Sequence, residues 1–451
     1  EIRNVALPEA YKQEGIKYVV RHEIGHCLGF MHNFAASSAI PVDSLRSPSF
    51  TSRYGTTYSI MDYARFNYVA QPGDKEKGVK LSPPQFGLYD YYLVKWNYTC
   101  FDPSSPAGEE KSALAKLISD KAGDARYRYG SSQGIDPSVQ TEDLGDDAVK
   151  ASVYGVSNLK YLMAHLNEWV GKEDKDYSYR KNIWERAVAQ YVAYVNHVYA
   201  NVGGIYMNEK HVGDPRPFFL SVSRQKQEAA VSWLLEELSD LEWIEDPAVL
   251  SNMTLTGTPV AVLRTNITKA LLEAPYKVSL AALKSPEQNP YTPADVLKQV
   301  YEAIWSKTTG NRALTAGERE IQKAYVAAAI SNAGIISSPA GAVQTGIKEG
   351  FTPAIQLPGL NPYRSMESGF GRLHDVGAGH GKMTTIPAFN PVAGFDGGRV
   401  NFNRKAPLET LYYANLRELR SLLGKRVKKV ADNETRVHYK LLLNQIDKVL
   451  K

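Results

Sequence analysis

The chain has 451 residues, of which 43% are hydrophobic and 22% are charged, as in an ordinary globular protein. Its formal net charge of +5, from 53 basic and 48 acidic side chains, argues against nucleic-acid binding. No apolar stretch reaches the roughly 18 residues of a membrane span, so we expect no transmembrane segment. A chain of this length predicts two or three domains with substantial cores.

Near the N-terminus, a predicted helix and the turn after it contain three of the nine histidines. His22 and His26 stand four residues apart, which places both imidazoles on one helix face. Gly29 allows the helix to stop and the chain to turn back, so that His32 reaches the same point from another direction. Glu23 lies beside this point, at the position of a general base. The spacing predicts a hydrolytic site with one zinc ion.

This predicted helix, over residues 10–31, is apolar on its other side. At about 100° per residue, six apolar side chains fall within one stripe roughly 120° wide. We therefore expect a core-facing side opposite the metal-binding side. The alternative is a solvated helix face whose histidines are ordinary polar residues, and the third histidine at the required spacing argues against it. The stripe consists of Ile16, Val20, Ile24, Cys27, Leu28 and Met31.

The next stretch, residues 33–81, is rich in Ser, Pro, Gly and Tyr and is predicted to be a loop along one wall of the cleft. It contains Ser59–Tyr63 (SIMDY), about thirty residues beyond the third histidine. A helix is predicted to follow, with Ser82 as its cap and Pro83 in its first turn. It continues from Phe86 to Trp96.

Three segments resemble the metzincin clan of zinc peptidases, and most closely a family of large bacterial zinc-dependent metalloproteases. They are Arg21 to Phe34 (RHEIGHCLGFMHNF), Ser59 to Asp74 (SIMDYARFNYVAQPGD) and Tyr89 to Trp96 (YDYYLVKW). The resemblance covers the first hundred residues and continues more loosely to the C-terminus. It implies zinc-dependent peptide-bond hydrolysis, a protein or peptide substrate, and export to the periplasm, the outer membrane or the cell exterior.

The resemblance also implies roles for three further residues. Met61 would form the floor of the metal pocket without binding the metal. Tyr63 matches a tyrosine that, in some members, approaches the zinc or steadies the tetrahedral intermediate. Asn33 follows the third histidine, at a position that differs between subfamilies, and would hydrogen-bond the turn around Met61. For Met61 and Tyr63 the alternative is ordinary packing in an apolar turn.

These residues imply a defined chemistry. Three neutral imidazoles leave zinc one open position for water. The metal lowers the pKa of that water from nearly 16 to about 7. Glu23 would take the proton as the water attacks a peptide carbonyl and then pass it to the departing amine. Zinc, helped by the hydroxyl of Tyr63, would stabilise the developing oxyanion.

Metzincins carry a twisted sheet before the metal helix, and its edge strand holds the substrate backbone. Such a sheet cannot fit into the roughly ten residues before the predicted helix. We therefore expect residues 1–100 to be the C-terminal portion of a catalytic domain. An upstream portion of the same polypeptide would complete the cleft, and the fragment alone would have little activity.

Beyond residue 100, helical periodicity dominates, so the expected fold class is mainly α, with a helical domain over residues 101–336. A short hairpin is expected where Ile205–Met207 returns through His211–Val212. The predicted helices of this domain lie near residues 109–121, 145–170, 177–201, 224–240, 258–274, 293–306 and 315–333.

The last predicted domain, residues 337–451, begins with a Gly- and Pro-rich region and closes with helices over residues 408–423 and 434–450. Val376–Gly381 could suggest a phosphate-binding loop, but no Lys-Ser/Thr follows it, and a long surface loop is favoured. His374 and His380 are more often loop residues than metal ligands.

Three functions remain open from the sequence. The first is a zinc endopeptidase or its catalytic C-terminal portion. The second is a non-catalytic helical binding or scaffolding module that retains the metal site. The third is an exopeptidase or a hydrolase of another amide, since no pocket for a terminal charge can be identified.

Overall fold

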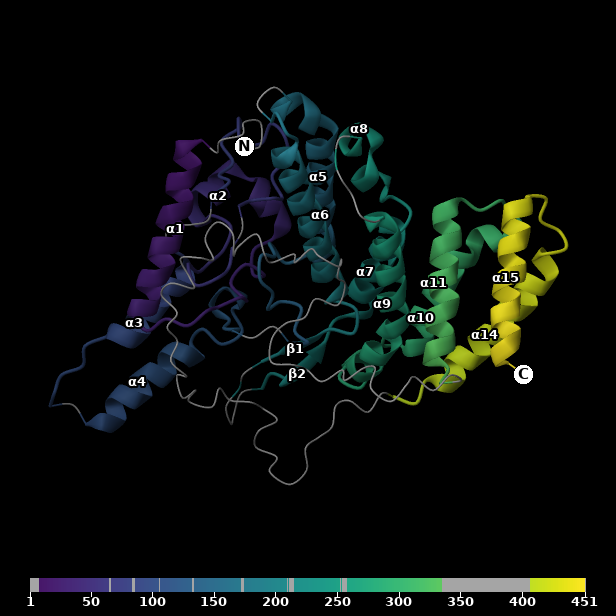
Figure 1. The fold of residues 1–451 in the computed structure, drawn as a ribbon. Coiled ribbons are helices and arrows are strands. Elements are labelled where there is room, and N and C mark those ends of the chain that lie inside the picture. The colour runs from purple at the N-terminus through teal and green to yellow at the C-terminus, as the bar shows by residue number, and fades with distance from the viewer. Residues whose placement is uncertain are drawn as a thin grey trace, which may run out of the picture. The chain divides into compact units, whose positions relative to one another are not determined.

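The chain is mainly helical, with one two-stranded sheet among the residues described, and this confirms the predicted fold class (Figure 1). In this computed structural model, the chain forms two compact units. Unit 1 comprises Glu1–Val222 with Trp243–Leu255, and unit 2 comprises Ser223–Glu242 with Thr256–Lys451. The structure describes residues 8–64, 66–82, 86–104, 106–131, 134–171, 174–208, 210, 215–251, 253, 258–334 and 406–450.

The predicted metal site lies in the first part of unit 1. The metal helix ends at Cys27 rather than near residue 31, because Gly29, with φ of 78°, turns the chain back. The predicted loop after it contains a 3-10 helix and a short α-helix. The elements of this part are α1 (Glu9–Cys27), η1 (Val42–Arg46), α2 (Pro48–Tyr54), α3 (Leu88–Tyr98), α4 (Ala107–Ser119) and η2 (Ala125–Tyr127).

Helix α3 begins at Leu88, so the predicted start at Ser82 is wrong. Its cap is Gly87, whose N–H donates to the carboxylate of Asp90 at 2.7 Å. This bond closes the first turn of the helix several residues later than the serine and proline signal suggested. Pro83 and Pro84 lie outside the described residues.

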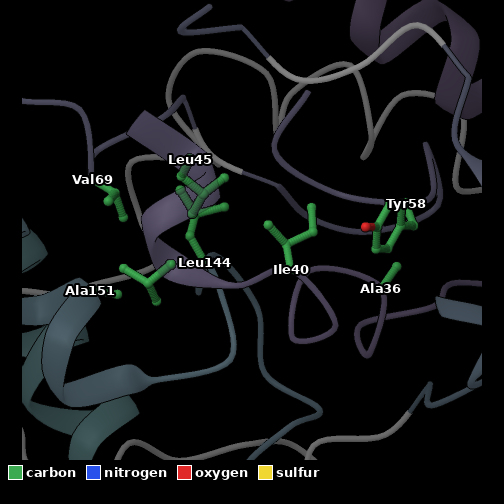
Figure 2. Packing of buried hydrophobic residues seen from close by; sticks show 8 residues of the cluster. Ala36, Ile40, Leu45, Tyr58, Val69, Leu144 and Ala151 are labelled. Carbon is green, nitrogen blue, oxygen red and sulfur yellow. The ribbon is translucent and has the colours of Figure 1, made fainter. Parts of the chain in front are cut away.

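A cluster of buried apolar side chains supports the irregular stretch after α1. Figure 2 shows that side chains far apart in the sequence, such as Leu45 and Leu144, lie together in it. The stretch predicted as a loop therefore has a core of its own, which gives the metal site a packed support. The cluster consists of Ala36, Ile40, Val42, Leu45, Tyr58, Val69, Leu144 and Ala151.

In the rest of unit 1, the two long helices and the first strand lie close to their predicted positions, whereas the second strand and the short helices were not predicted. β1 (Ile205–Met207) pairs antiparallel with β2 (Phe219–Ser221), with Tyr206 opposite Leu220. The predicted partner of β1, His211–Val212, lies outside the described residues. The other elements are α5 (Ala148–Val170), α6 (Ser178–Tyr199), η3 (Glu242–Glu245) at the boundary between the units, and α8 (Pro247–Leu250).

Unit 2 is formed by helices whose positions the sequence periodicity predicted to within a few residues, apart from the end of one. Helix α9 runs beyond its predicted end at residue 274 and continues through Pro275 to Ala282. The helices are α7 (Arg224–Glu237), α9 (Pro259–Ala282), α10 (Pro293–Thr309), α11 (Ala316–Asn332), α14 (Glu409–Arg426) and α15 (Asn433–Val449).

Several predictions concern segments that the structure does not describe. The glycine-rich Val376–Gly381, His374 and His380 fall within residues 335–405, which lie outside the described residues. The three-part division at residues 100 and 336 stays a prediction. Within the described ranges, no helix is both long and apolar enough to cross a membrane.

Candidate metal centre

The three predicted histidine ligands converge on one point. His22 and His26 project from α1, and His32 projects from the segment that turns back after the helix. One ring nitrogen of each lies within 4.8 Å of the other two, and the Nε2 atoms of His26 and His32 are 3.1 Å apart. Two imidazole nitrogens on one tetrahedral zinc ion lie about 3.3 Å apart, given Zn–N bonds of about 2.0–2.1 Å. The donor set fits one zinc ion.

Hydrogen bonds to carbonyl oxygens orient two of the rings. Nδ1 of His22 donates to the carbonyl oxygen of Ile60 at 2.6 Å, and Nδ1 of His26 donates to that of Phe30 at 2.9 Å. A carbonyl oxygen can only accept, so the ring proton is on Nδ1 and the lone pair is on Nε2. This is the tautomer that a zinc ligand needs, and the bond also holds the ring at a defined angle.

Met61 lies directly against the metal helix, where the resemblance placed the floor of the pocket. Its side chain is fully buried. A Cβ atom on Gly25 would come within 2.4 Å of the Met61 sulfur, so a larger residue between the two helical histidines would displace the methionine. No pattern in the sequence marks this role of Gly25. Met61 packs in a cluster with Phe30, Ile60, Leu28 and Leu93.

The first turn of α3 holds the turn formed by Ser59–Tyr63, which we call the Met61 turn. Asp90 is fully buried, and its carboxylate accepts hydrogen bonds from Ser59 Oγ at 2.7 Å and from the Ile60 N–H at 2.9 Å. Burial raises the pKa of this carboxyl. The carbonyl oxygen of Ile60 accepts from His22, so Asp90 supports His22 through the backbone of Ile60. The role of Asp90 was not predicted either, although it lies within a segment that carries the family resemblance.

Tyr63 lies against the histidines, and Glu23 follows His22 on α1. The Tyr63 ring centroid is 4.8 Å from that of His32 and 5.6 Å from that of His22. Burial raises the pKa of the Tyr63 hydroxyl, and the charge of Glu23 raises it further. Glu23 itself is exposed on α1.

Asn33 contacts the Met61 turn through its backbone, and its side chain has a different function. Its N–H donates to the carbonyl oxygen of Met61 at 3.0 Å. The side-chain Oδ1 accepts from the Gly130 N–H at 2.9 Å, and Nδ2 donates to the Arg128 carbonyl oxygen at 2.9 Å. The buried amide therefore ties the segment around residue 130 to the end of the metal-binding motif.

The apolar stripe of α1 is exposed in the described structure, so the predicted core-facing side is wrong there. Ile16 is 53% exposed, and Val20 and Ile24 are each 49% exposed. The helix packs on the Met61 turn through its opposite face, because His22 has to reach both Ile60 and the other ligands. A helix cannot bury both faces against one turn. Met31 and Cys27 are also exposed, whereas Leu28 packs beside Met61.

Comparison with known proteins assigns a family. A profile of the family described as Met-zincin matches residues 4–312, which is more than half of the chain. Neither the curated proteins nor the solved structures gave a match to this chain. The matched range includes the histidines, the Met61 turn and α3.

Proposed function

Because the chain belongs to the Met-zincin family of zinc-dependent metalloproteases, we propose that it is an endopeptidase whose active site is the His22, His26 and His32 centre. One observation supports this proposal most strongly. The ring nitrogens of the three histidines meet within 4.8 Å, on the helix that also presents Glu23. Three imidazoles with a neighbouring carboxylate form the donor set and base of a hydrolytic zinc site.

Each residue has one task in the proposed reaction. A zinc ion held by the three histidines would lower the pKa of a water molecule to about 7 and polarise the substrate carbonyl. The Glu23 carboxylate accepts the proton of the attacking water and then delivers it to the departing amine nitrogen. The Tyr63 hydroxyl donates a hydrogen bond to the developing oxyanion. A tyrosine hydroxyl has an ordinary pKa of about 10, so it is protonated, and therefore able to donate, across the neutral range.

The proposal includes an upstream portion of the same polypeptide that completes the cleft. Its support in the structure is the exposed stripe of α1, where Ile16, Val20 and Ile24 are each about half exposed. Apolar side chains in a row along one helix face gain free energy when a further segment covers them, at about 25 cal/mol per Å². Export of the protein is also part of the proposal, and it rests on the family resemblance of the three sequence segments.

A cleavage assay with peptides blocked at both ends tests the endopeptidase function, because exopeptidases cannot act on them. Glu23→Gln should keep zinc bound and lower kcat by about 10²–10⁴-fold. Glu14→Gln removes a charge from the same helix away from the site and should leave kcat unchanged. A zinc chelator should abolish cleavage, and added zinc should restore it.

Two results would contradict the proposal in different ways. Cleavage by Glu23→Gln at more than a few per cent of the wild-type rate would show that Glu23 is not the general base. Zinc bound without cleavage, by the full chain joined to its upstream portion, would favour the non-catalytic binding module.

A further inference from the structure

One hydroxyl of the metal helix lies between the two peptide groups that flank Tyr63. Tyr18 is on α1, one turn before His22. Its hydroxyl donates a hydrogen bond to the carbonyl oxygen of Asp62 and accepts one from the Ala64 N–H at 3.3 Å. The Tyr18 ring centroid is 6.4 Å from that of His22. A single side chain thus connects the helix that carries two metal ligands to the backbone on both sides of Tyr63.

The Tyr63 backbone is also held from a second direction. Its carbonyl oxygen accepts from the Glu142 N–H at 3.1 Å. Glu142 is buried and has φ of 66°, a conformation that costs free energy in a residue other than glycine and persists where its surroundings require it. The neighbouring Asp62 carboxylate accepts from the Ser37 N–H at 2.8 Å and from Thr57 Oγ1 at 2.9 Å. The backbone around Tyr63 therefore has defined anchors on each side.

These anchors matter because the Tyr63 ring lies against the histidines. Its centroid is 4.8 Å from that of His32, so a shift of the backbone moves the hydroxyl relative to the metal ligands. Misplacement of a reacting group by about 1 Å can cost 10²-fold in rate. Because this anchor is on the same helix as His22, His26 and Glu23, it ties the position of Tyr63 to that of these three residues.

We propose that Tyr18 is a positioning residue that sets the place of the Tyr63 hydroxyl relative to the metal helix. The proposal rests on the proposed function, which makes Tyr63 the donor to the oxyanion. The hydrogen bonds of the Tyr18 hydroxyl go to backbone groups on either side of Tyr63, so we expect it to act on the reaction through Tyr63.

A double-mutant cycle separates positioning from mere packing. Tyr18→Phe keeps the ring and removes the hydroxyl, and it should lower kcat about tenfold with little change in KM or zinc content. In a Tyr63→Phe background the same change should have less than about a twofold effect, because there is no hydroxyl left to place. Tyr11→Phe, the same substitution elsewhere on α1, is the control and should leave kcat unchanged. Equal losses from Tyr18→Phe in both backgrounds would overturn the proposal.

Amide hydrogen exchange gives a readout that does not depend on activity. Without the Tyr18 hydroxyl, the Ala64 N–H loses its acceptor, so exchange in residues 62–64 should speed up in Tyr18→Phe and stay unchanged in Tyr11→Phe. Unchanged exchange in Tyr18→Phe would overturn the proposal. If the full chain joined to its upstream portion binds zinc but cleaves no peptide, the proposed function fails, and the exchange rates still decide whether Tyr18 anchors this segment.

Discussion

The metal centre and the helical unit 2 are each stabilised by a different kind of interaction. Around the metal, buried polar side chains such as Asn33 and Asp90 bond to backbone groups of an irregular chain. In α14 of unit 2, leucines at three- and four-residue spacing are fully buried. The first region depends on individual hydrogen bonds and close approaches, and the second on summed apolar area. A change of one atom should therefore matter much more in the first region. The buried leucines are Leu416, Leu419 and Leu423.

The largest effect on stability is expected where α3 meets the Met61 turn. A Cβ atom on Gly87 would lie 1.8 Å from the carbonyl oxygen of Tyr58, which is backbone and cannot rotate away. Gly87→Ala should therefore destabilise unit 1 by about 3 kcal/mol or more. Chemical denaturation, with zinc loss as the signal of unfolding, measures this change in stability. A shift of less than about 1 kcal/mol would show that the contact is not tight.

An effect of similar size is expected in unit 2 when the pH falls. His438 is buried, and its Nε2 lies 3.1 Å from Oε1 of Gln322. Burial, together with the charges of Arg319 and Lys323, lowers the pKa of His438 from 6.5 to about 4. Between these two pH values the unfolded chain binds a proton that the folded chain does not bind.

The stability of unit 2 should therefore be complete above about pH 6.5 and fall by about 3 kcal/mol as the pH falls to about 4. His438→Gln keeps a hydrogen-bond donor and cannot titrate, so this part of the pH dependence should vanish in the variant. Denaturant midpoints of both proteins between pH 4 and pH 7 measure the difference. Parallel pH profiles would contradict the assignment to His438.

A smaller effect is expected from Asp90, which acts on the metal through one residue of backbone. In Asp90→Asn one of the two carboxylate oxygens becomes an NH2 donor, so the side chain can no longer accept from both Ser59 Oγ and the Ile60 N–H, and the support of His22 is weakened. Zinc affinity should fall about 10–100-fold, as for other groups that orient a ligand. Competition with a chromogenic chelator measures it, and Asp102→Asn at an exposed carboxylate is the control. Equal zinc affinities of the two variants would show that Asp90 only stabilises the fold.

The smallest effect should have the opposite sign. Gly424 lies in α14, and a Cβ atom built on it meets no atom within 4 Å. Gly424→Ala should stabilise unit 2 by about 0.5–1 kcal/mol, since alanine is the better helix former. Gly87→Ala and Gly424→Ala are the same substitution in the two regions, so their effects on stability can be compared directly. Destabilisation by both would remove the contrast between them.

The same contrast explains which features could be predicted from the sequence. The helices of unit 2 follow the three- and four-residue spacing of apolar side chains, and this spacing is visible in the chain itself. The three histidines are predictable because zinc requires donors at a defined separation along a helix and its turn. Both signals are local.

The missed features depend on interactions between distant segments. Asp90 bonds to Ile60, and Asn33 bonds to Gly130, at separations that no periodic pattern marks. For α1 the periodicity showed correctly that one face is apolar but not what packs against it, so the buried and exposed faces were assigned wrongly. A hydrophobic stripe shows which helix face is apolar, whereas its burial depends on which other segment packs against that face.

The central claim is that His22, His26 and His32 bind one zinc ion. The most direct measurement is the zinc content of the full chain by elemental analysis, together with X-ray absorption at the zinc edge. We predict one equivalent of zinc with three imidazole nitrogens at about 2.0–2.1 Å, and loss of this zinc in His26→Ala. A wild-type protein without zinc, or undiminished zinc in His26→Ala, would contradict the claim.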